Sequence, residues 1–171
     1  MKKLFLLALV LVSLSCNAQK VLSGSFELPA GEKYFYLDWD CSQTLFESKF
    51  NEKEWRAIHG DDWEKAKKEV IEMIMRDLNN SMGKISIIAV LPGGELKGTC
   101  TLYVCPQKLD RKGNNKSVYI LKDANGKELG KAEFKGSGGH WGSFANLIGD
   151  GYENAGSKLA SLLKKYNKKK R

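Results

Sequence analysis

Apolar residues recur at three- and four-residue spacing between residues 61 and 82, which predicts a long amphipathic helix. Asp61 or Asp62 is expected to cap its N-terminus, and Gly83 is expected to end it. The stripe that faces the core is predicted to contain Trp63, Ala66, Val70, Ile74, Leu78 and Met82. A shorter helix is predicted for residues 51–58, because Asn51 and Glu54 have the spacing of a capping box.

A second long apolar stripe runs from about Ser143 to Tyr166 and predicts a C-terminal helix. Three glycines, Gly149, Gly151 and Gly156, fall inside it. Each glycine costs about 1 kcal/mol relative to alanine in a helix. We therefore expect a close approach of this helix to the sheet, which only glycine would permit.

Six segments have the composition and alternation of strands: 21–28, 34–41, 84–91, 98–105, 117–122 and 127–135. The first two flank a turn at 29–32, and the last two flank the sequence DANG, which favours a hairpin. Residues 84–91 are apolar on both faces, as in a central strand. The polar segment 106–115 is expected to be a long, mobile loop.

The order of these elements predicts the class of fold. Two strands, a helix, four strands and a final helix favour an α+β two-layer sandwich, with a largely antiparallel sheet and two main helices packed on one face. Residues 20–166 are long enough to form one domain with its own core, and no repeat or internal linker divides them.

The first eighteen residues have the pattern of an export signal. Lys2 and Lys3 precede an apolar run of about eleven residues at 4–14, which is short for a membrane span. Cleavage after Ala18 would leave Gln19 first, whereas lipoprotein processing would make Cys16 the lipidated first residue. Both routes take the chain out of the cytosol, to the periplasm or the outer membrane.

The formal charge of +8 is concentrated at the two ends of the chain. Of the 28 Lys and Arg residues, two lie in the export signal and six in residues 164–171, which leaves twenty against twenty Asp and Glu. The neutral body argues against nucleic-acid binding, which needs a basic face on the fold itself. Residues 167–171 are expected to be a disordered basic tail, for which contact with an anionic membrane is an alternative.

The cysteines favour buried thiols over a disulfide framework. Cys100 and Cys105 lie in one predicted strand, about 16 Å apart at 3.3 Å per residue, too far for a bond between them. A single disulfide would therefore have to use Cys41. The odd number and the absence of a C-x-x-C motif argue against a structural zinc site.

The segment GSGGHWGSF, residues 136–144, is the candidate binding site of the sequence. It follows a strand and opens a helix, so that its N–H groups and the helix N-terminus have the arrangement that binds anions. The candidate residues are Gly138, Gly139, His140, Trp141, Gly142 and Ser143. No strand follows and no Walker pattern is present, so neither nucleotide fingerprint is complete. The alternative is a tight corner with Ser143 as helix cap and Trp141 packed over it.

No catalytic or metal-binding set is evident in the sequence. His140 and His59 are its two histidines, no G-x-S-x-G or H-E-x-x-H motif occurs, and no cofactor is predicted. Asp38 and Asp40 share one strand face, which is more typical of a solvated surface than of a carboxylate pair. Tyr34 and Tyr36 lie on that face and leave carbohydrate binding as an alternative.

The boundary SCNAQ at residues 15–19 is similar to export signals common in the Bacteroides group of Gram-negative bacteria. The stretch from Gly126 to Lys165 resembles the C-terminal part of uncharacterised envelope proteins and lipoproteins from such bacteria. This resemblance implies an exported α+β domain in the periplasm or on the outer membrane. It implies no reaction and no catalytic residue.

Three functions follow as hypotheses. The first is an exported, non-enzymatic envelope module that binds a protein or a surface component. The second is a small-ligand or anion-binding protein that uses the turn from Gly138 to Ser143. The third is a hydrolase in which His140 acts with a cysteine or an aspartate.

Overall fold

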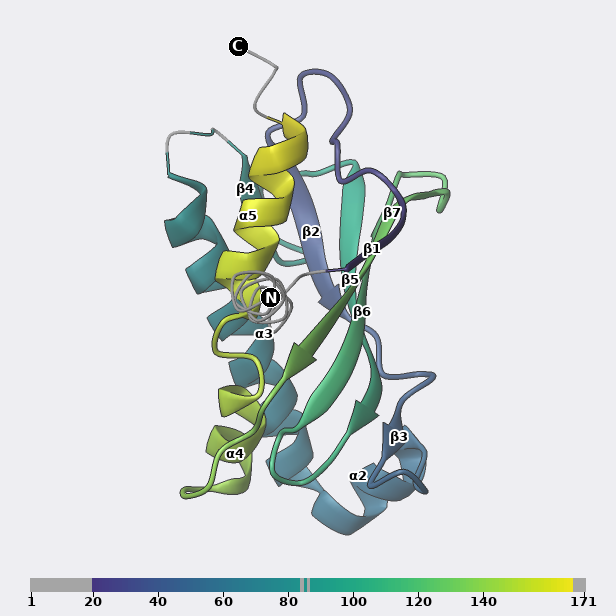
Figure 1. Ribbon diagram of the computed structural model, residues 1–171, viewed down its shortest axis with the longest axis vertical. Coiled ribbons are helices and arrows are strands. Elements are labelled where there is room, and N and C mark those ends of the chain that lie inside the picture. The colour runs from purple at the N-terminus through teal and green to yellow at the C-terminus, as the bar shows by residue number, and fades with distance from the viewer. Residues whose placement is uncertain (1–19, 84, 86, 168–171) are drawn as a thin grey trace, which may run out of the picture.

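The computed structural model describes residues 20–83, 85 and 87–167 as seven strands and four helices. In chain order the elements are β1 (Lys20–Gly24), β2 (Tyr34–Trp39), β3 (Leu45–Phe46), α2 (Glu52–His59), α3 (Asp61–Met82), β4 (Ile88–Val90), β5 (Cys100–Leu109), β6 (Asn115–Lys122), β7 (Glu128–Gly136), α4 (Phe144–Asp150) and α5 (Ala155–Asn167) (Figure 1). No helix among these residues is long and apolar enough to cross a membrane.

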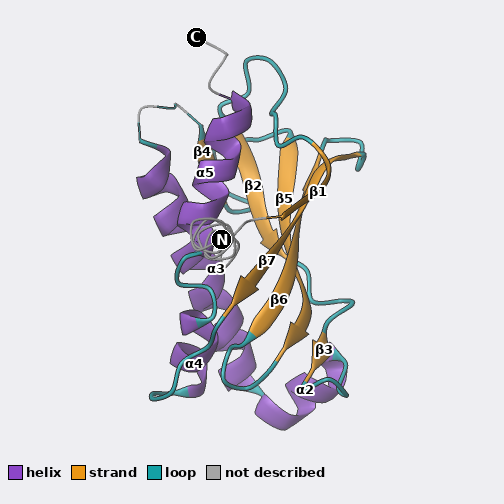
Figure 2. Cartoon of the chain, viewed as in Figure 1, coloured by secondary structure: helices purple, strands orange, loops and turns teal. Residues whose placement is uncertain are grey.

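The predicted α+β two-layer class is confirmed. The seven strands form one sheet in the order β1-β7-β6-β5-β2-β4, with β3 pairing separately to β5. Helices α3, α4 and α5 form the second layer on one face (Figure 2). The long ladders β5–β6 and β6–β7 are antiparallel, as expected. The sheet is nevertheless mixed, because β2 pairs in parallel with both β4 and β5.

The core lies between the sheet and α3, whose predicted stripe is confirmed. All six residues of the stripe are at most 2% exposed: Trp63, Ala66, Val70, Ile74, Leu78 and Met82. Gly60 stands at the N-cap position of α3, where the sequence predicted Asp61 or Asp62. The capping box of α2 is present, since Asn51 and Glu54 each bond to the other's backbone N–H.

The first two predicted strands do not form a hairpin. β1 pairs with β7 at one edge of the sheet, whereas β2 lies four strands away between β5 and β4. The connecting segment leaves the sheet after Gly24 and buries Phe26 and Leu28. A parallel partner for β2 comes from later in the chain, and alternation along β2 carries no information about that partner.

The sequence predicted a central strand for residues 84–91, whereas the described residues of this segment form the short edge strand β4. β4 is a three-residue edge strand, with Ala89 buried and Ile88 42% exposed. The side chain of Asn79 on α3 accepts the Ala89 N–H at 2.8 Å and donates to the Ala89 carbonyl at 3.0 Å. This pair of bonds covers the outer side of the edge strand, where a further strand would otherwise pair.

The segment 106–115 consists of the end of β5, a tight turn at residues 110–114 and the first residue of β6. β5 continues to Leu109 and β6 begins at Asn115. The Asp110 carboxylate accepts the backbone N–H groups of Lys112 and Asn114 at 2.9 and 3.0 Å. The expected long, mobile loop is therefore wrong, because the aspartate side chain closes the turn locally.

The predicted C-terminal helix is broken at residues 151–154 into α4 and α5. Gly156 is buried against α3: a Cβ there would lie 2.5 Å from the Ile74 carbonyl oxygen and 2.6 Å from the Leu78 nitrogen. At Gly156 the close approach is thus to a helix, whereas at Gly151 it is to the sheet, because a Cβ there would meet the Gly113 carbonyl of the β5–β6 turn and the Asn115 side chain of β6. Asn167, which the sequence placed in the basic tail, ends α5 with 5% exposure. Its side chain bonds to the Leu28 N–H and to two carbonyls. Residues 168–171 and the export signal lie outside the described residues.

Candidate functional site

The glycine-rich turn that follows β7 is held in place by packing. A Cβ at Gly138 would meet the Lys112 carbonyl, and one at Gly139 would meet the Asp150 carboxylate. The N–H of Gly138 donates to the Asn114 side chain at 3.0 Å. These two glycines permit the turn to lie directly on the 110–114 turn and on α4.

The six candidate residues of the turn have different surroundings in the structure. Ser143 caps α4 by accepting the Asn146 N–H at 3.3 Å, which is the structural role that the alternative assigned to it. Gly142 has a φ of +127°, which favours glycine. His140 is exposed, and no hydrogen bond or ion pair joins it to another described residue. Trp141 is 90% exposed, so the expectation that it packs over the corner is wrong.

A polar cleft of about 310 Å³ lies beside the base of this turn. β7 and the first residue of the turn form one wall, and the break between α4 and α5 forms the other. The lining comprises Asn115, Tyr119, Phe134, Lys135, Gly136, Ser137, Asp150, Gly151, Glu153, Asn154, Ala155 and Lys158. Only Gly136 and Ser137 come from the segment that the sequence singled out, and neither was among the candidate ligand residues.

A buried polar network stands beneath this cleft. The Asn115 amide donates to the Gly151 carbonyl at 2.8 Å and to the Gly113 carbonyl at 3.1 Å. Ser117 donates to the Asn115 side-chain oxygen at 2.9 Å and lies 3.2 Å from the Tyr152 hydroxyl. Burial raises the pKa of Tyr152 well above its ordinary value, so this phenol stays neutral. The network fixes the α4–α5 break on the end of β6.

The face of the sheet away from the helices carries an aromatic and aliphatic surface, here called the open sheet face. It is defined by Tyr34, Tyr36, Asp38, Ile88, Val90, Thr101, Tyr103, Ile120, Lys122 and Lys131, which alternate with core residues along their strands. Asp38, Tyr103, Ile120 and Lys131 stand side by side in one row across four strands. The Lys122 ammonium lies 5.1 Å from the centre of the Tyr103 ring.

This composition is unusual for the solvated face of a sheet, because the residues that point to solvent from such strands are normally polar. Each of the three tyrosines is partly exposed. Farther along β6 and β7, an ion pair of 2.9 Å joins Lys116 to Glu133, and it holds the pKa of Glu133 below its usual value. An aromatic surface bordered by charges of both signs is typical of a protein interface. Tyr34 and Tyr36 were visible in the sequence, whereas the position of Tyr103 beside them needed the parallel pairing of β2 and β5.

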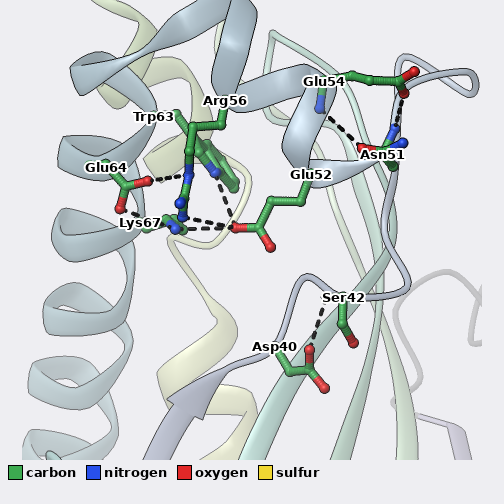
Figure 3. A network of polar contacts seen from close by, with 9 residues as sticks. All are labelled: Asp40, Ser42, Asn51, Glu52, Glu54, Arg56, Trp63, Glu64 and Lys67. Atoms are coloured by element: carbon green, nitrogen blue, oxygen red, sulfur yellow. Dashed lines mark hydrogen bonds and ion pairs between the residues drawn. The ribbon is translucent and has the colours of Figure 1, made fainter.

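A cluster of charged residues joins α2 to α3 (Figure 3). Glu52 accepts from Lys67 at 3.1 Å and from the Trp63 indole at 3.3 Å, and Glu64 pairs with Arg56 at 2.8 Å and with Lys67 at 3.2 Å. Each group therefore has a partner within the cluster. Exposed pairs of this kind contribute about 1 kcal/mol or less, and the cluster is a structural joint.

The buried thiols lack the environment of a nucleophile. No disulfide joins Cys41, Cys100 and Cys105 within the described chain, and all three are buried. Burial, reinforced by the Glu52 charge, raises the pKa of Cys41 far above its ordinary range, and burial raises that of Cys105 to about 11. Thiols are nucleophilic as thiolates, so these two are inert near neutral pH. Among the described residues, no group of three His, Cys, Asp or Glu side chains is placed to hold a metal ion.

The structure is thus an α+β domain with an open sheet face and a polar cleft. The chain was then compared with known proteins. No family model and no curated protein matches the sequence. The PelC dodecamer from Paraburkholderia phytofirmans with one leucine replaced by methionine is similar at 12% identity and a TM-score of 0.44, covering 84% of this chain and 97% of that chain. The PelC dodecamer from the same organism is similar at 12% identity and a TM-score of 0.43, covering 82% of this chain and 96% of that chain. An uncharacterised protein is similar at 9% identity and a TM-score of 0.41, covering 81% of this chain and 98% of the other.

Proposed function

We propose that the chain is an exported envelope protein that acts as a binding module, and that its open sheet face binds another protein of the envelope. The observation that carries this proposal is that Tyr34, Tyr36 and Tyr103 are partly exposed on the face of the sheet that no helix of the described residues covers. Tyrosine is enriched in protein interfaces because it buries a large ring and keeps a polar end.

The charges around the tyrosines supply the specificity of such an interface. Asp38 is opposite Tyr103 in the β2–β5 ladder, and Lys122 and Lys131 follow on β6 and β7. Charges of both signs at the rim favour one orientation of the partner and disfavour surfaces of a single sign. A protein partner with mixed charge therefore fits this face better than a uniformly anionic polymer.

The envelope location rests on the export signal, and the tail gives the module a second contact. Either a lipid on Cys16 or cleavage after Ala18 remains part of the proposal. The basic residues 168–171 follow directly on Asn167 at the end of α5. In a lipid-anchored protein this tail would contact anionic headgroups, each basic residue adding about 1 kcal/mol near the surface.

The test compares two purified double variants as baits on native envelope extracts. Tyr36→Ser with Tyr103→Ser removes two rings from the open sheet face, and Glu72→Ser with Lys68→Ser changes two exposed positions on α3. We expect the tyrosine variant alone to lose a partner that the wild-type protein retains, with circular dichroism unchanged in both. Equal recovery of the same partners by all three proteins would contradict the proposal.

A further inference from the structure

The polar cleft between β7 and the α4–α5 break is lined by a buried tyrosine whose hydroxyl the protein itself does not use. Tyr119 on β6 lines the cleft and is only 1% exposed. Its hydroxyl has no hydrogen-bond partner among the described residues. By contrast, Asn115, Ser117 and Tyr152 beside it bond to one another or to the backbone.

The Tyr119 hydroxyl is not sealed in the core. Among the described residues, the side-chain atoms that are both fully enclosed and without a hydrogen-bond partner are the indole nitrogens of Trp39 and Trp55. The Tyr119 hydroxyl also lacks a partner in this part of the chain but is not one of these atoms, so it is not fully enclosed. An unpaired buried hydroxyl is costly unless something bonds to it. The cleft that Tyr119 lines is the opening through which a bonding partner reaches this group.

The cleft is preformed and does not need a ligand to shape it. The Tyr119 ring packs edge-on against Phe134, with the ring centres 4.0 Å apart. The Asn115 amide ties the Gly151 carbonyl to the end of β6, which fixes the opposite wall. A preformed site loses little conformational entropy on binding, and about 310 Å³ is at the small end of ligand pockets.

The lining determines the chemistry of the ligand. Asp150 and Glu153 supply carboxylate acceptors, Lys135 supplies a donor, and Asn154 supplies both. A simple anion would meet the two carboxylates, and a simple cation would meet the lysine. Hydroxyl groups donate and accept at once, so a neutral molecule with several hydroxyls matches all of these groups.

We propose that this cleft binds a neutral polyhydroxylated small molecule of the size of one or two sugar residues, with one hydroxyl bonded to Tyr119. Burial raises the pKa of Tyr119 far above its usual value, so the phenol keeps its proton and both donates and accepts. This site lies on the helical side of the sheet and does not depend on the open sheet face.

The test measures binding of D-glucose, N-acetyl-D-glucosamine, trehalose and inorganic phosphate by saturation-transfer NMR and calorimetry. Tyr119→Phe removes only the hydroxyl, so stability is expected to be retained because no described residue bonds to that group. Tyr166→Phe is the matched control, since it removes a phenol hydroxyl from a residue of α5 that does not line the cleft and is not part of the buried network beneath it.

We expect at least one of the three sugars to bind, Tyr119→Phe to weaken that binding roughly 3- to 10-fold as for one hydrogen bond, and Tyr166→Phe to bind as the wild type does. The Tyr36→Ser, Tyr103→Ser variant should also bind sugar normally, which separates this inference from the proposed function. Binding of phosphate alone, binding of none of the probes, or unchanged affinity in Tyr119→Phe would overturn the proposal.

Discussion

Two glycines in the C-terminal helical segment should respond in opposite directions to the same substitution. Gly149 lies in α4 and Gly156 in α5, and alanine is the better helix former at both. A Cβ at Gly149 would have no atom within 4 Å. A Cβ at Gly156 would lie 2.5–2.7 Å from three atoms of α3, two of them in the backbone.

The magnitudes follow from these contacts. Gly149→Ala should stabilise the fold by about 0.5–1 kcal/mol through helix propensity alone. Gly156→Ala gains the same propensity but must separate α5 from α3, and overpacking costs about 1–3 kcal/mol. The atoms that the new Cβ meets belong to the body of a helix and cannot rotate away. We therefore take the upper end of this overpacking cost, about 3 kcal/mol. The net loss is then about 2 kcal/mol, or roughly 4–8 °C in Tm.

Urea unfolding of the two variants beside the wild type measures this difference, with far-UV circular dichroism as the probe. The expected result is a higher midpoint for Gly149→Ala and a lower one for Gly156→Ala. If both variants moved in the same direction, or if Gly156→Ala were as stable as the wild type, the close packing of α5 on α3 would be wrong.

Three further predictions concern single side chains. Asn167→Ala should destabilise the fold by about 3 kcal/mol in urea unfolding, because it leaves the Leu28 N–H and the Phe26 carbonyl without their side-chain partner. A loss under 1 kcal/mol would instead place Asn167 in the tail. Partial burial between Trp55 and Phe144 lowers the pKa of His59 below its ordinary value. The fold therefore favours the neutral imidazole, and stability should decline as the pH falls from 7 to 5. His59→Phe should flatten this decline, and an unchanged slope would refute it. Cys41 and Cys105 should not react with Ellman's reagent at pH 8 until the protein is unfolded; fast labelling of the folded protein would contradict their burial.

The sequence predicted well the elements whose pairing partner is close in sequence and the helix whose apolar repeat extends over many turns. The six-residue stripe of α3 and the hairpin at residues 123–126 were correct because local spacing determines both. The break between α4 and α5 was missed, since an apolar stripe passes through it and only the contact of Gly151 with the 110–114 turn reveals it. The parallel pairing of β2 depends on long-range contacts, which alternation does not encode.

The same distinction applies to the candidate sites. The glycines of residues 136–142 predicted a turn, and the structure explains Gly138 and Gly139 by packing. The sequence could not place Tyr103 beside Tyr36, because that needs the register of two parallel strands. It also could not distinguish Tyr119, whose unpaired hydroxyl depends on which neighbours surround it in three dimensions.

The most direct test of the binding module is photo-cross-linking in intact cells. Tyr36 on the open sheet face is replaced by photoreactive p-benzoylphenylalanine, and Glu72 on the exposed side of α3 is replaced in the same way as the control. The account predicts that irradiation joins the protein to an envelope protein from position 36 and not from position 72. A cross-link to a cytosolic protein, equal cross-linking from both positions, or none from position 36 would contradict it.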